Sequence, residues 1–269
     1  MLELEKIRKC VIPAAGIGKR FYPLTRAQPK EILPILDKPV IHYVVEEALN
    51  SGLDEILIIV GAGKDAIINY FDKHRLDGEM DDYDFRNIPD IYFVRQKEPK
   101  GLADAILCAE HFTGGDDFVV LLGDTIYRSG EANTVTSHIM NDYYNLKKPV
   151  IAVEKVDKEK VSDYGIVNPV EVGKSPFRIK GVVEKPNPED APSDLGITGI
   201  YVFGEYIYDY VREIKPGKNG ELQLSDAIAL MVRDLDVYGS VIRGKRFDIG
   251  SKDLWIKTFF EFAREKGLV

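Results

Sequence analysis

Short apolar runs alternate with segments of helical periodicity over roughly the first 150 residues of this chain. The apolar runs predict strands, and the segments between them predict helices. The expected strands are Ile7–Pro13, Glu55–Val60, Ile91–Arg95, Asp117–Leu122 and Val150–Val156, and the expected helices are Pro39–Asn50, Asp65–Lys73, Gly101–His111 and Glu131–Leu146. Because these strands are apolar on both faces, helices must cover both sides of the sheet they form. The sequence therefore predicts an α/β fold with a Rossmann-like, mostly parallel sheet.

The pattern changes after residue 157, where turns rich in Gly, Pro and Asn separate the apolar segments. The expected strands are Tyr164–Pro169, Phe177–Lys185, Gly196–Phe203 and Asp236–Ile242, and the expected helices are Glu205–Ile214, Leu224–Leu235 and Ser251–Lys266, the last with Ser251 as its N-cap. The GKRFDIG stretch is expected to be a turn, and the acid-rich segment Asp77–Asp90 a solvated loop. No linker is visible. We expect one domain over residues 1–269. Its second part, residues 157–269, extends the first part, residues 1–156, with strands that bind a second substrate.

Composition narrows the class of protein. The 269 residues carry a net charge of −8, which argues against a general nucleic-acid surface. No apolar run approaches the roughly 20 residues that span a bilayer, and the charged N-terminal stretch lacks the apolar core of a signal peptide. Two cysteines, Cys10 and Cys108, are expected to be buried reduced thiols. These features predict a cytoplasmic protein without a membrane partner.

Small residues follow the first predicted strand, in the order Ala14, Ala15, Gly16, Ile17, Gly18. Small side chains let backbone N–H groups approach an anion, although many strand-to-helix turns carry two glycines without binding anything. A P-loop and a dinucleotide-binding fingerprint would both require a glycine at the position of Phe21. Neither motif is present.

Cations and prolines fill the segment after this loop. The cations are Arg20, Arg26 and Lys30, and the prolines are Pro23, Pro29 and Pro34. The prolines fix φ and exclude a helix there. Each cation alone fits a solvated surface position, but three beside a small-residue loop favour a preformed cradle for a polyphosphate.

Gln96 and Gly101 are candidates for recognition of a nucleotide base. Gln96 ends a strand and Gly101 opens a helix. A glutamine offers a donor and an acceptor to a pyrimidine edge, and a glycine permits close approach of a flat ring. A glutamine at the surface and a glycine at a helix N-terminus, without any ligand, explain the same residues.

Two aspartates are candidates for a metal site. Asp124 follows the apolar VVLLG and Asp248 lies in RFDIG. Carboxylates at the carboxyl edge of a sheet suit Mg²⁺ and phosphates, although a turn residue and a helix cap are equally simple explanations.

Glu184 and Lys185 are adjacent at the end of a predicted strand. Neighbours in a strand normally face opposite sides. Because proline follows, Lys185 is expected to be extended, and a bend could bring both side chains to one site. Glu184 could then accept hydrogen bonds from sugar hydroxyls while Lys185 pairs with a phosphate. A charged strand end without a ligand explains the pair equally well.

Taken together, the motifs resemble those of the nucleotidylyltransferases that activate sugar 1-phosphates. The matching stretches are AAGIGKRFYPLT, PKEILPILDKPVIHYVVEEAL, RQ with GLADAILCA, LLGDTIY, YGIV, VVEKP, ELQLSDAI and FDIGSKDLW, in family order over nearly the whole chain. The PKE triplet with its LP and DKP is similar to the UTP–glucose-1-phosphate uridylyltransferase branch. Two positions depart from the pattern: Lys19 replaces the usual Thr, and LGD stands where bacterial uridylyltransferases often have LPD.

This resemblance implies a nucleotide-diphospho-sugar transferase fold and a set of site residues. It implies catalytic roles for Arg20, Lys30 and Lys185; nucleotide binding by Ala14, Ala15, Gly16, Glu31, Gln96 and Gly101; sugar-phosphate binding by Gly165, Glu184, Lys185, Thr198 and Gly199; and Mg²⁺ binding by Asp124 and Asp248. It also implies a homodimer or homotetramer. The first part of the domain is then the nucleotide-binding part, and the second part binds the sugar and ends in a helix.

The implied reaction joins UTP and glucose 1-phosphate to give UDP-glucose and pyrophosphate. Uracil and thymine differ by one methyl group, which typically changes binding by only ~1–3 kcal/mol, so dTTP remains an alternative nucleotide. A nucleotide-sugar sensor without catalysis is the alternative from another class. Retention of both acids and all the cations disfavours it.

Overall fold

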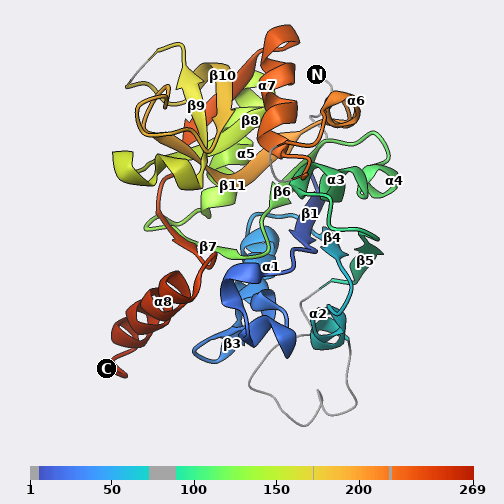
Figure 1. Ribbon diagram of the computed structural model, residues 1–269, viewed down its shortest axis with the longest axis vertical. Helices are drawn as coiled ribbons and strands as arrows, with labels where there is room; N and C mark the ends of the chain where they lie inside the picture. The colour runs from blue at the N-terminus through green and yellow to red at the C-terminus, as the bar shows by residue number, and fades with distance from the viewer. Residues whose placement is uncertain (1–5, 73–88, 172, 218–219) are drawn as a thin grey trace.

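The computed structural model describes residues 6–72, 89–171, 173–217 and 220–269. Nine strands of these residues form one sheet (Figure 1). In spatial order they are β5 (Ile91–Arg95), β4 (Glu55–Val60), β1 (Lys9–Ala14), β6 (Phe118–Leu121), β11 (Leu195–Phe203), β8 (Val150–Lys155), β12 (Val237–Val241), β10 (Phe177–Glu184) and β9 (Gly165–Pro169). The predicted α/β fold is confirmed. Residues 77–88 of the predicted acid-rich loop lie outside the described residues.

Parallel pairing runs through the first part of the sheet and gives way to mixed pairing in the second. Strands β5, β4, β1 and β6 pair in parallel, and so do β8 and β12. By contrast, β11 is antiparallel to both β6 and β8, and β10 is antiparallel to β12 and β9. Strand β11 comes late in the chain yet lies in the middle of the sheet, so both parts of the chain build one continuous sheet.

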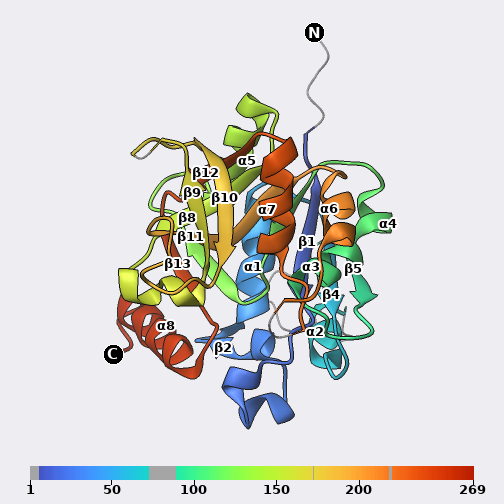
Figure 2. The ribbon, with the colours of Figure 1, turned by 45° about the horizontal axis from the view of Figure 1, so that its top comes forward.

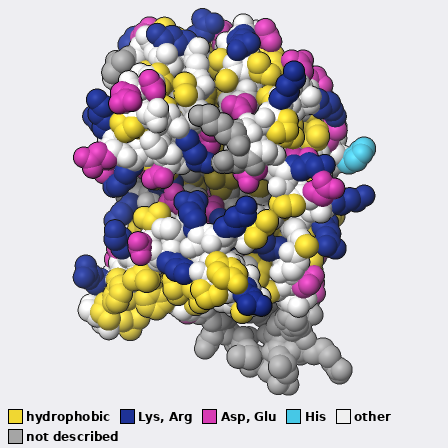
Figure 3. Space-filling view, viewed as in Figure 1, with side chains coloured by type: hydrophobic (Ala, Val, Ile, Leu, Met, Phe, Trp, Pro, Cys, Tyr) yellow, Lys and Arg dark blue, Asp and Glu magenta, His cyan; other side chains and the backbone are white. Residues whose placement is uncertain are grey.

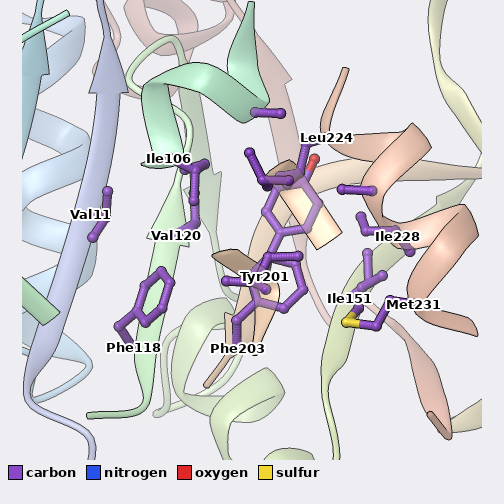
Figure 4. Close-up of a cluster of buried hydrophobic side chains, with 14 of the residues drawn as sticks. Val11, Ile106, Phe118, Val120, Ile151, Tyr201, Phe203, Leu224, Ile228 and Met231 are labelled. Atoms are coloured by element: carbon purple, nitrogen blue, oxygen red, sulfur yellow. The ribbon is translucent and has the colours of Figure 1, made fainter. Parts of the chain in front are cut away.

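Helices cover both faces of this sheet. The helices are α1 (Val40–Asn50), α2 (Asp65–Phe71), α3 (Leu102–Leu107), α4 (Glu110–Thr113), α5 (Val135–Leu146), α6 (Ile207–Glu213), α7 (Leu224–Asp234) and α8 (Lys252–Glu265). Side chains alternate along a strand, so Val11 packs with α3, α6 and α7, whereas Cys10 and Ile12 pack with α1 and α5. Figure 2 shows α6 and α7 on one side of the sheet, and Figure 4 shows the core beneath them.

A third apolar cluster joins the segment after β1 to the C-terminal helix. It contains Phe21, Ile35, Phe247 and Phe262, all buried. Helix α8 begins after Ser251, whose Oγ accepts a hydrogen bond from the Leu254 N–H at 3.4 Å, which confirms the predicted N-cap. Figure 1 shows α8 projecting from the sheet beside β7. This cluster fixes the loop after β1 against the end of the chain.

Two predicted elements differ in kind from the structure, and the predicted helix Glu131–Leu146 begins later, at Val135. The predicted helix Gly101–His111 is divided into α3 and α4, because the N–H groups of Cys108 and Ala109 bond carbonyls three residues back instead of four. The predicted GKRFDIG turn contains a strand, β13 (Lys245–Asp248), which pairs with β7 (Thr125–Arg128). A strand of four residues is too short to show an apolar period in the sequence.

The proline-rich segment contains no α-helix, as predicted, but it is not irregular. It forms three single 3₁₀ turns, Lys19–Phe21, Leu24–Arg26 and Lys30–Ile32, and a short hairpin of β2 (Pro34–Ile35) and β3 (Lys38–Pro39); a further 3₁₀ segment spans Lys158–Asp163. These turns place the predicted cations at defined positions.

The two cysteines are free thiols, but they differ in burial. Cys10 is buried as predicted, whereas Cys108 is only partly buried. None of the described helices is both long enough and apolar enough to cross a bilayer.

Candidate active site

The carboxyl ends of four parallel strands meet at one edge of the sheet. Ala14 at the end of β1 lies beside Val60 of β4, which lies beside Arg95 of β5. The Ala15–Gly16 loop, Gln96 and Asp124 follow the ends of β1, β5 and β6. Ligands of open α/β sheets bind at this edge, and the predicted nucleotide residues lie along it.

A cavity of about 240 Å³ lies between this edge and the strands of the second part. Figure 3 shows a hollow in the middle of the face drawn in Figure 1, with Lys and Arg side chains around it. The predicted residues that line the cavity are Arg20, Asp124, Gly165, Glu184, Lys185, Thr198 and Asp248. Most residues predicted for catalysis, metal and sugar phosphate therefore share one cavity, although they come from distant parts of the chain. Lys30 and Gly199 are not among its lining residues.

Strands β7 and β13 bring the two predicted metal carboxylates together. Asp248 ends β13 and pairs with Thr125, the residue after Asp124. The Ile249 N–H also donates to the Asp124 carbonyl oxygen at 2.9 Å. The described residues contain no cluster of three or more His, Cys, Asp or Glu side chains suited to a metal ion. Two carboxylates fit Mg²⁺, which commonly takes one or two protein carboxylates together with substrate phosphate oxygens.

Lys30 forms an ion pair with Asp124, and both side chains are largely buried, at 15% and 20% exposure. Burial alone would lower the pKa of Lys30, but the carboxylates of Asp124 and Glu31 outweigh it and raise that pKa. Burial alone would raise the pKa of Asp124, but the Lys30 ammonium outweighs it and lowers that pKa. Both groups are therefore charged at neutral pH.

Arg20 and Asp248 both lie against Gly250. A Cβ atom on Gly250 would lie 2.6 Å from Asp248 Oδ1 and 3.2 Å from an Arg20 guanidinium nitrogen. The absence of a side chain at this position therefore leaves room for the carboxylate and the guanidinium side by side.

We expect Gly250→Ala to lower kcat/KM about tenfold, because the added methyl group must displace the Asp248 carboxylate, and small displacements at a reacting centre are costly. The steady-state rate of the reaction that the sequence resemblance implies measures the effect. Gly130→Ala is the matched control, because a Cβ atom there has no neighbour within 4 Å. An unchanged Gly250→Ala enzyme would contradict this reading of the contact.

Arg246 is a cavity residue that the sequence analysis missed. Its guanidinium is 8% exposed and contacts Glu154 at 2.6 Å, Asp248 Oδ2 at 3.1 Å and the Tyr164 hydroxyl at 3.0 Å. It therefore ties a predicted metal carboxylate to the second part of the domain. Had the strand β13 been recognised, its two-residue period would have placed Arg246 on the same face as Asp248.

At the end of β10, the backbone bends at Lys185. We predicted an extended Lys185, but its φ is 45°, in the left-handed region, and this prediction is wrong. The β10 strand ends at Glu184, and the Lys185 N–H donates to the Tyr164 carbonyl oxygen at 3.0 Å. This turn brings the Lys185 Nζ to 3.1 Å from Glu184 Oε1, and both side chains line the cavity. Ser225 also holds Glu184, through a hydroxyl donated to Oε2 at 2.7 Å.

Thr198 lines the same cavity. The residue is 1% exposed, and its buried Oγ1 has no hydrogen-bond partner among the described residues. A buried hydroxyl without a partner is costly. The next residue, Gly199, has φ 103° and packs on the Leu122 side chain, where a Cβ atom would clash at 2.8 Å.

The predicted nucleotide residues lie outside the lining of this cavity. Gly16 is exposed, with open space around it, whereas Ala14 and Ala15 are buried. The Gln96 side-chain nitrogen donates to the Gly101 carbonyl at 3.1 Å and to Asp104 at 2.7 Å. The structure thus places the loop, Gln96 and Gly101 along the edge beside the cavity.

The backbone around residue 101 requires a glycine. Its φ is 112°, and a Cβ atom would lie 2.4 Å from the Leu222 carbonyl oxygen. Close packing of the backbone therefore explains this glycine without a ligand.

Glu31, predicted to bind nucleotide, is 2% exposed and forms an ion pair with Lys64 at 2.6 Å. Lys64 carried no signal in the sequence beyond its place after a buried strand. The carboxylate of Glu31 thus faces a lysine rather than the cavity.

The sequence of this chain matches a known protein family over most of its length. The profile described as "Nucleotidyl transferase" matches residues 9–264. The chain belongs to the nucleotidyl transferase family. This membership confirms the family resemblance, and with it the expectation that the chain is an enzyme of this kind.

Relatives and solved structures of similar length support the same family. The UTP–glucose-1-phosphate uridylyltransferase of Bacillus subtilis (strain 168) is 40% identical over 273 residues, covering 97% of this nucleotidyl transferase and 93% of that protein. The structure of a UDP-glucose pyrophosphorylase complexed with UDP-glucose superposes with a TM-score of 0.91 at 37% identity, covering 97% and 100% of the two chains. A UTP-bound UGPase from Acinetobacter baumannii gives a TM-score of 0.87 at 33% identity, covering 97% and 94%. These matches confirm the predicted nucleotide-diphospho-sugar transferase fold.

Proposed function

We propose that this nucleotidyl transferase transfers UMP from UTP to glucose 1-phosphate, giving UDP-glucose and pyrophosphate. The observation that carries the proposal is the single cavity in which Asp124 and Asp248 face Glu184 and Lys185. This arrangement suits a triphosphate at the carboxyl edge of the sheet and a sugar phosphate against the second part. The names of the similar proteins supply the identity of the two substrates.

The proposed chemistry is one in-line substitution at phosphorus. A phosphate oxygen of glucose 1-phosphate forms a bond to the α-phosphorus of UTP, and the bond from that phosphorus to the oxygen that bridges the α- and β-phosphates breaks, so that this oxygen leaves as a terminal oxygen of pyrophosphate. The second pKa of a phosphate monoester is about 6, so the nucleophile is largely dianionic at pH 7 and needs no general base. The protein must then orient two anions and neutralise their charge.

The cations of the site are suited to this task. Arg20 and Lys30 belong to the nucleotide-binding part and would contact the triphosphate, whereas Lys185 would hold the phosphate of the sugar. When phosphate oxygens arrive, Lys30 can donate to them in place of Asp124. Charge-assisted hydrogen bonds of this kind strengthen as negative charge accumulates on the oxygens in the transition state.

Nucleotidyl transfer generally uses a divalent metal, and we propose Mg²⁺ here. Asp124 and Asp248 would hold it, and it would supply neutralisation of phosphate charge. The carboxylates are prepared for this role, since Lys30 and Arg246 keep each in a fixed orientation.

The remaining residues would recognise the substrates. The backbone of Ala14, Ala15 and Gly16 would hold the nucleotide, with Gln96 and Gly101 near the base, and Gly165, Glu184, Thr198 and Gly199 would bind the sugar. We propose one domain over residues 1–269, acting as a homodimer or homotetramer; the family resemblance supports the assembly.

Pyrophosphate release tests the proposal. Glucose 1-phosphate and Mg²⁺ are incubated in parallel with UTP, dTTP, ATP, CTP or GTP. We expect fast release with UTP and slower release with dTTP. Faster release with dTTP would make the chain a thymidylyltransferase with the same site. The proposal would be overturned if no nucleotide gave pyrophosphate release, either with glucose 1-phosphate or with the 1-phosphates of galactose, mannose and N-acetylglucosamine. That result would favour a nucleotide-sugar sensor.

A further inference from the structure

Two ion pairs lie next to each other below the loop that follows β1. Lys30 pairs with Asp124, and the next residue, Glu31, pairs with Lys64. The second pair is the more deeply buried, with side-chain exposures of 6% for Lys64 and 2% for Glu31. Residues 30 and 31 share one 3₁₀ turn, so the four groups form a row of alternating charge, Asp124, Lys30, Glu31, Lys64.

The four charged groups in this row interact electrostatically. Burial lowers the pKa of Lys30, but the carboxylates of Asp124 and Glu31 together raise it, and Asp124 and Lys30 both act on the pKa of Lys64. Lys30 thus has two carboxylates within its electrostatic reach but forms its hydrogen bond with Asp124 alone. Glu31 instead accepts its hydrogen bond from Lys64.

Such a buried pair is a poor source of stability. Burial raises the pKa of Glu31 and lowers that of Lys64, so each group is driven toward its neutral form and is held charged chiefly by its partner. Replacement of a buried ion pair by apolar residues is often neutral or stabilising. A role in the chemistry next to it explains the pair better than a role in folding.

We propose that Lys64 is a positioning residue. Its ion pair with Glu31 keeps that carboxylate from pairing with Lys30, so that Lys30 stays beside Asp124 and can contact substrate phosphate. Without Lys64, the buried Glu31 carboxylate would have Lys30 as its nearest available cation. Lys30 would then turn from the cavity edge toward Glu31. This inference rests on the proposed nucleotidyl transfer, in which Lys30 contacts the triphosphate.

Lys64→Met tests the proposal, because methionine has a similar length and no charge. We expect kcat/KM for UTP to fall about 30-fold, since Lys30 is misplaced at the reacting centre. The double variant Glu31→Gln/Lys64→Met removes the competing carboxylate and is expected to recover to within about fivefold of the wild type. Lys64→Arg should retain most activity. Lys174→Met, which breaks the exposed pair with Glu171, is the control and should change nothing.

Each rate is expressed per folded enzyme, with the folded fraction taken from circular dichroism, and the binding of UTP is measured separately by calorimetry. Wild-type activity in Lys64→Met would overturn the proposal. A double variant as impaired as Lys64→Met would also overturn it, since Lys64 would then contact substrate itself. If Lys64→Met does not fold, the double variant decides, because it leaves neither buried charge without its partner: activity within about fivefold of the wild type supports the proposal, and a loss of about 30-fold overturns it.

The two proposals can fail separately. A wild-type protein that binds UTP but releases no pyrophosphate overturns the proposed function. In that case, the same variants are compared by calorimetric affinity for UTP. A loss of affinity in Lys64→Met that the double variant restores would still support the positioning role, and equal affinities would overturn it.

Discussion

Lys30→Ala is expected to lower kcat/KM at least ~100-fold, equivalent to about 2.7 kcal/mol of transition-state stabilisation. Lys30 is largely buried, keeps its charge through Asp124 and Glu31, and packs against the loop after β1, where a Cβ atom on Gly18 would be 3.7 Å from its Cγ. Alanine removes the cation and leaves Asp124 without its partner. Steady-state pyrophosphate release measures the change.

Lys19→Ala is the matched control for this variant. Lys19 belongs to the same segment, but it is exposed. We expect it to keep near-normal activity. Near-normal turnover by Lys30→Ala would remove Lys30 from the catalytic residues, and an equal loss in both variants would show that general positive charge, rather than the placement of Lys30, matters.

Asp124→Asn is expected to lower kcat/KM about 1,000-fold, or roughly 4 kcal/mol. The amide has nearly the same shape as the carboxylate, but it removes one of the two charges that would hold Mg²⁺ and the charge that compensates Lys30. The concentration of Mg²⁺ needed for half-maximal activity should also rise. A titration of activity with Mg²⁺ measures both effects.

Asp116→Asn controls for the loss of a carboxylate as such. Asp116 pairs with Lys9 at 2.6 Å but is 60% exposed, so its removal should change activity little. The proposed metal role of Asp124 fails if Asp124→Asn retains activity within tenfold of the wild type at ordinary Mg²⁺ concentrations.

Most strands could be predicted because each is a short apolar run bounded by turn residues. Glu55–Val60 and Ile91–Arg95 were predicted with the bounds that the structure has. β13 could not be predicted, since a strand of four residues shows no apolar period and its partner β7 is distant in the sequence. The division of Gly101–His111 was also missed, because a change from four-residue to three-residue hydrogen bonds leaves no apolar signature.

Part of the candidate site could be predicted from motifs and part could not. Arg20, Asp124 and Lys185 were identified by sequence, and the structure brings them to one cavity. Arg246 and Lys64 were missed, because their importance lies in the partners that they contact rather than in a local pattern. Buried charges of this kind are found only when the fold shows which opposite charge each one meets.

The position of β11 (Leu195–Phe203) between β6 and β8 governs how a growing chain can fold on the ribosome. Until residue 203 has left the exit tunnel, β6 (Phe118–Leu121) lacks its antiparallel neighbour and presents an open apolar edge. Open edges of this kind pair with other chains and aggregate. The nascent protein therefore exposes this edge through synthesis of its first three quarters, and β12 (Val237–Val241), which joins β8 to β10, can complete the sheet only after β11 has been made.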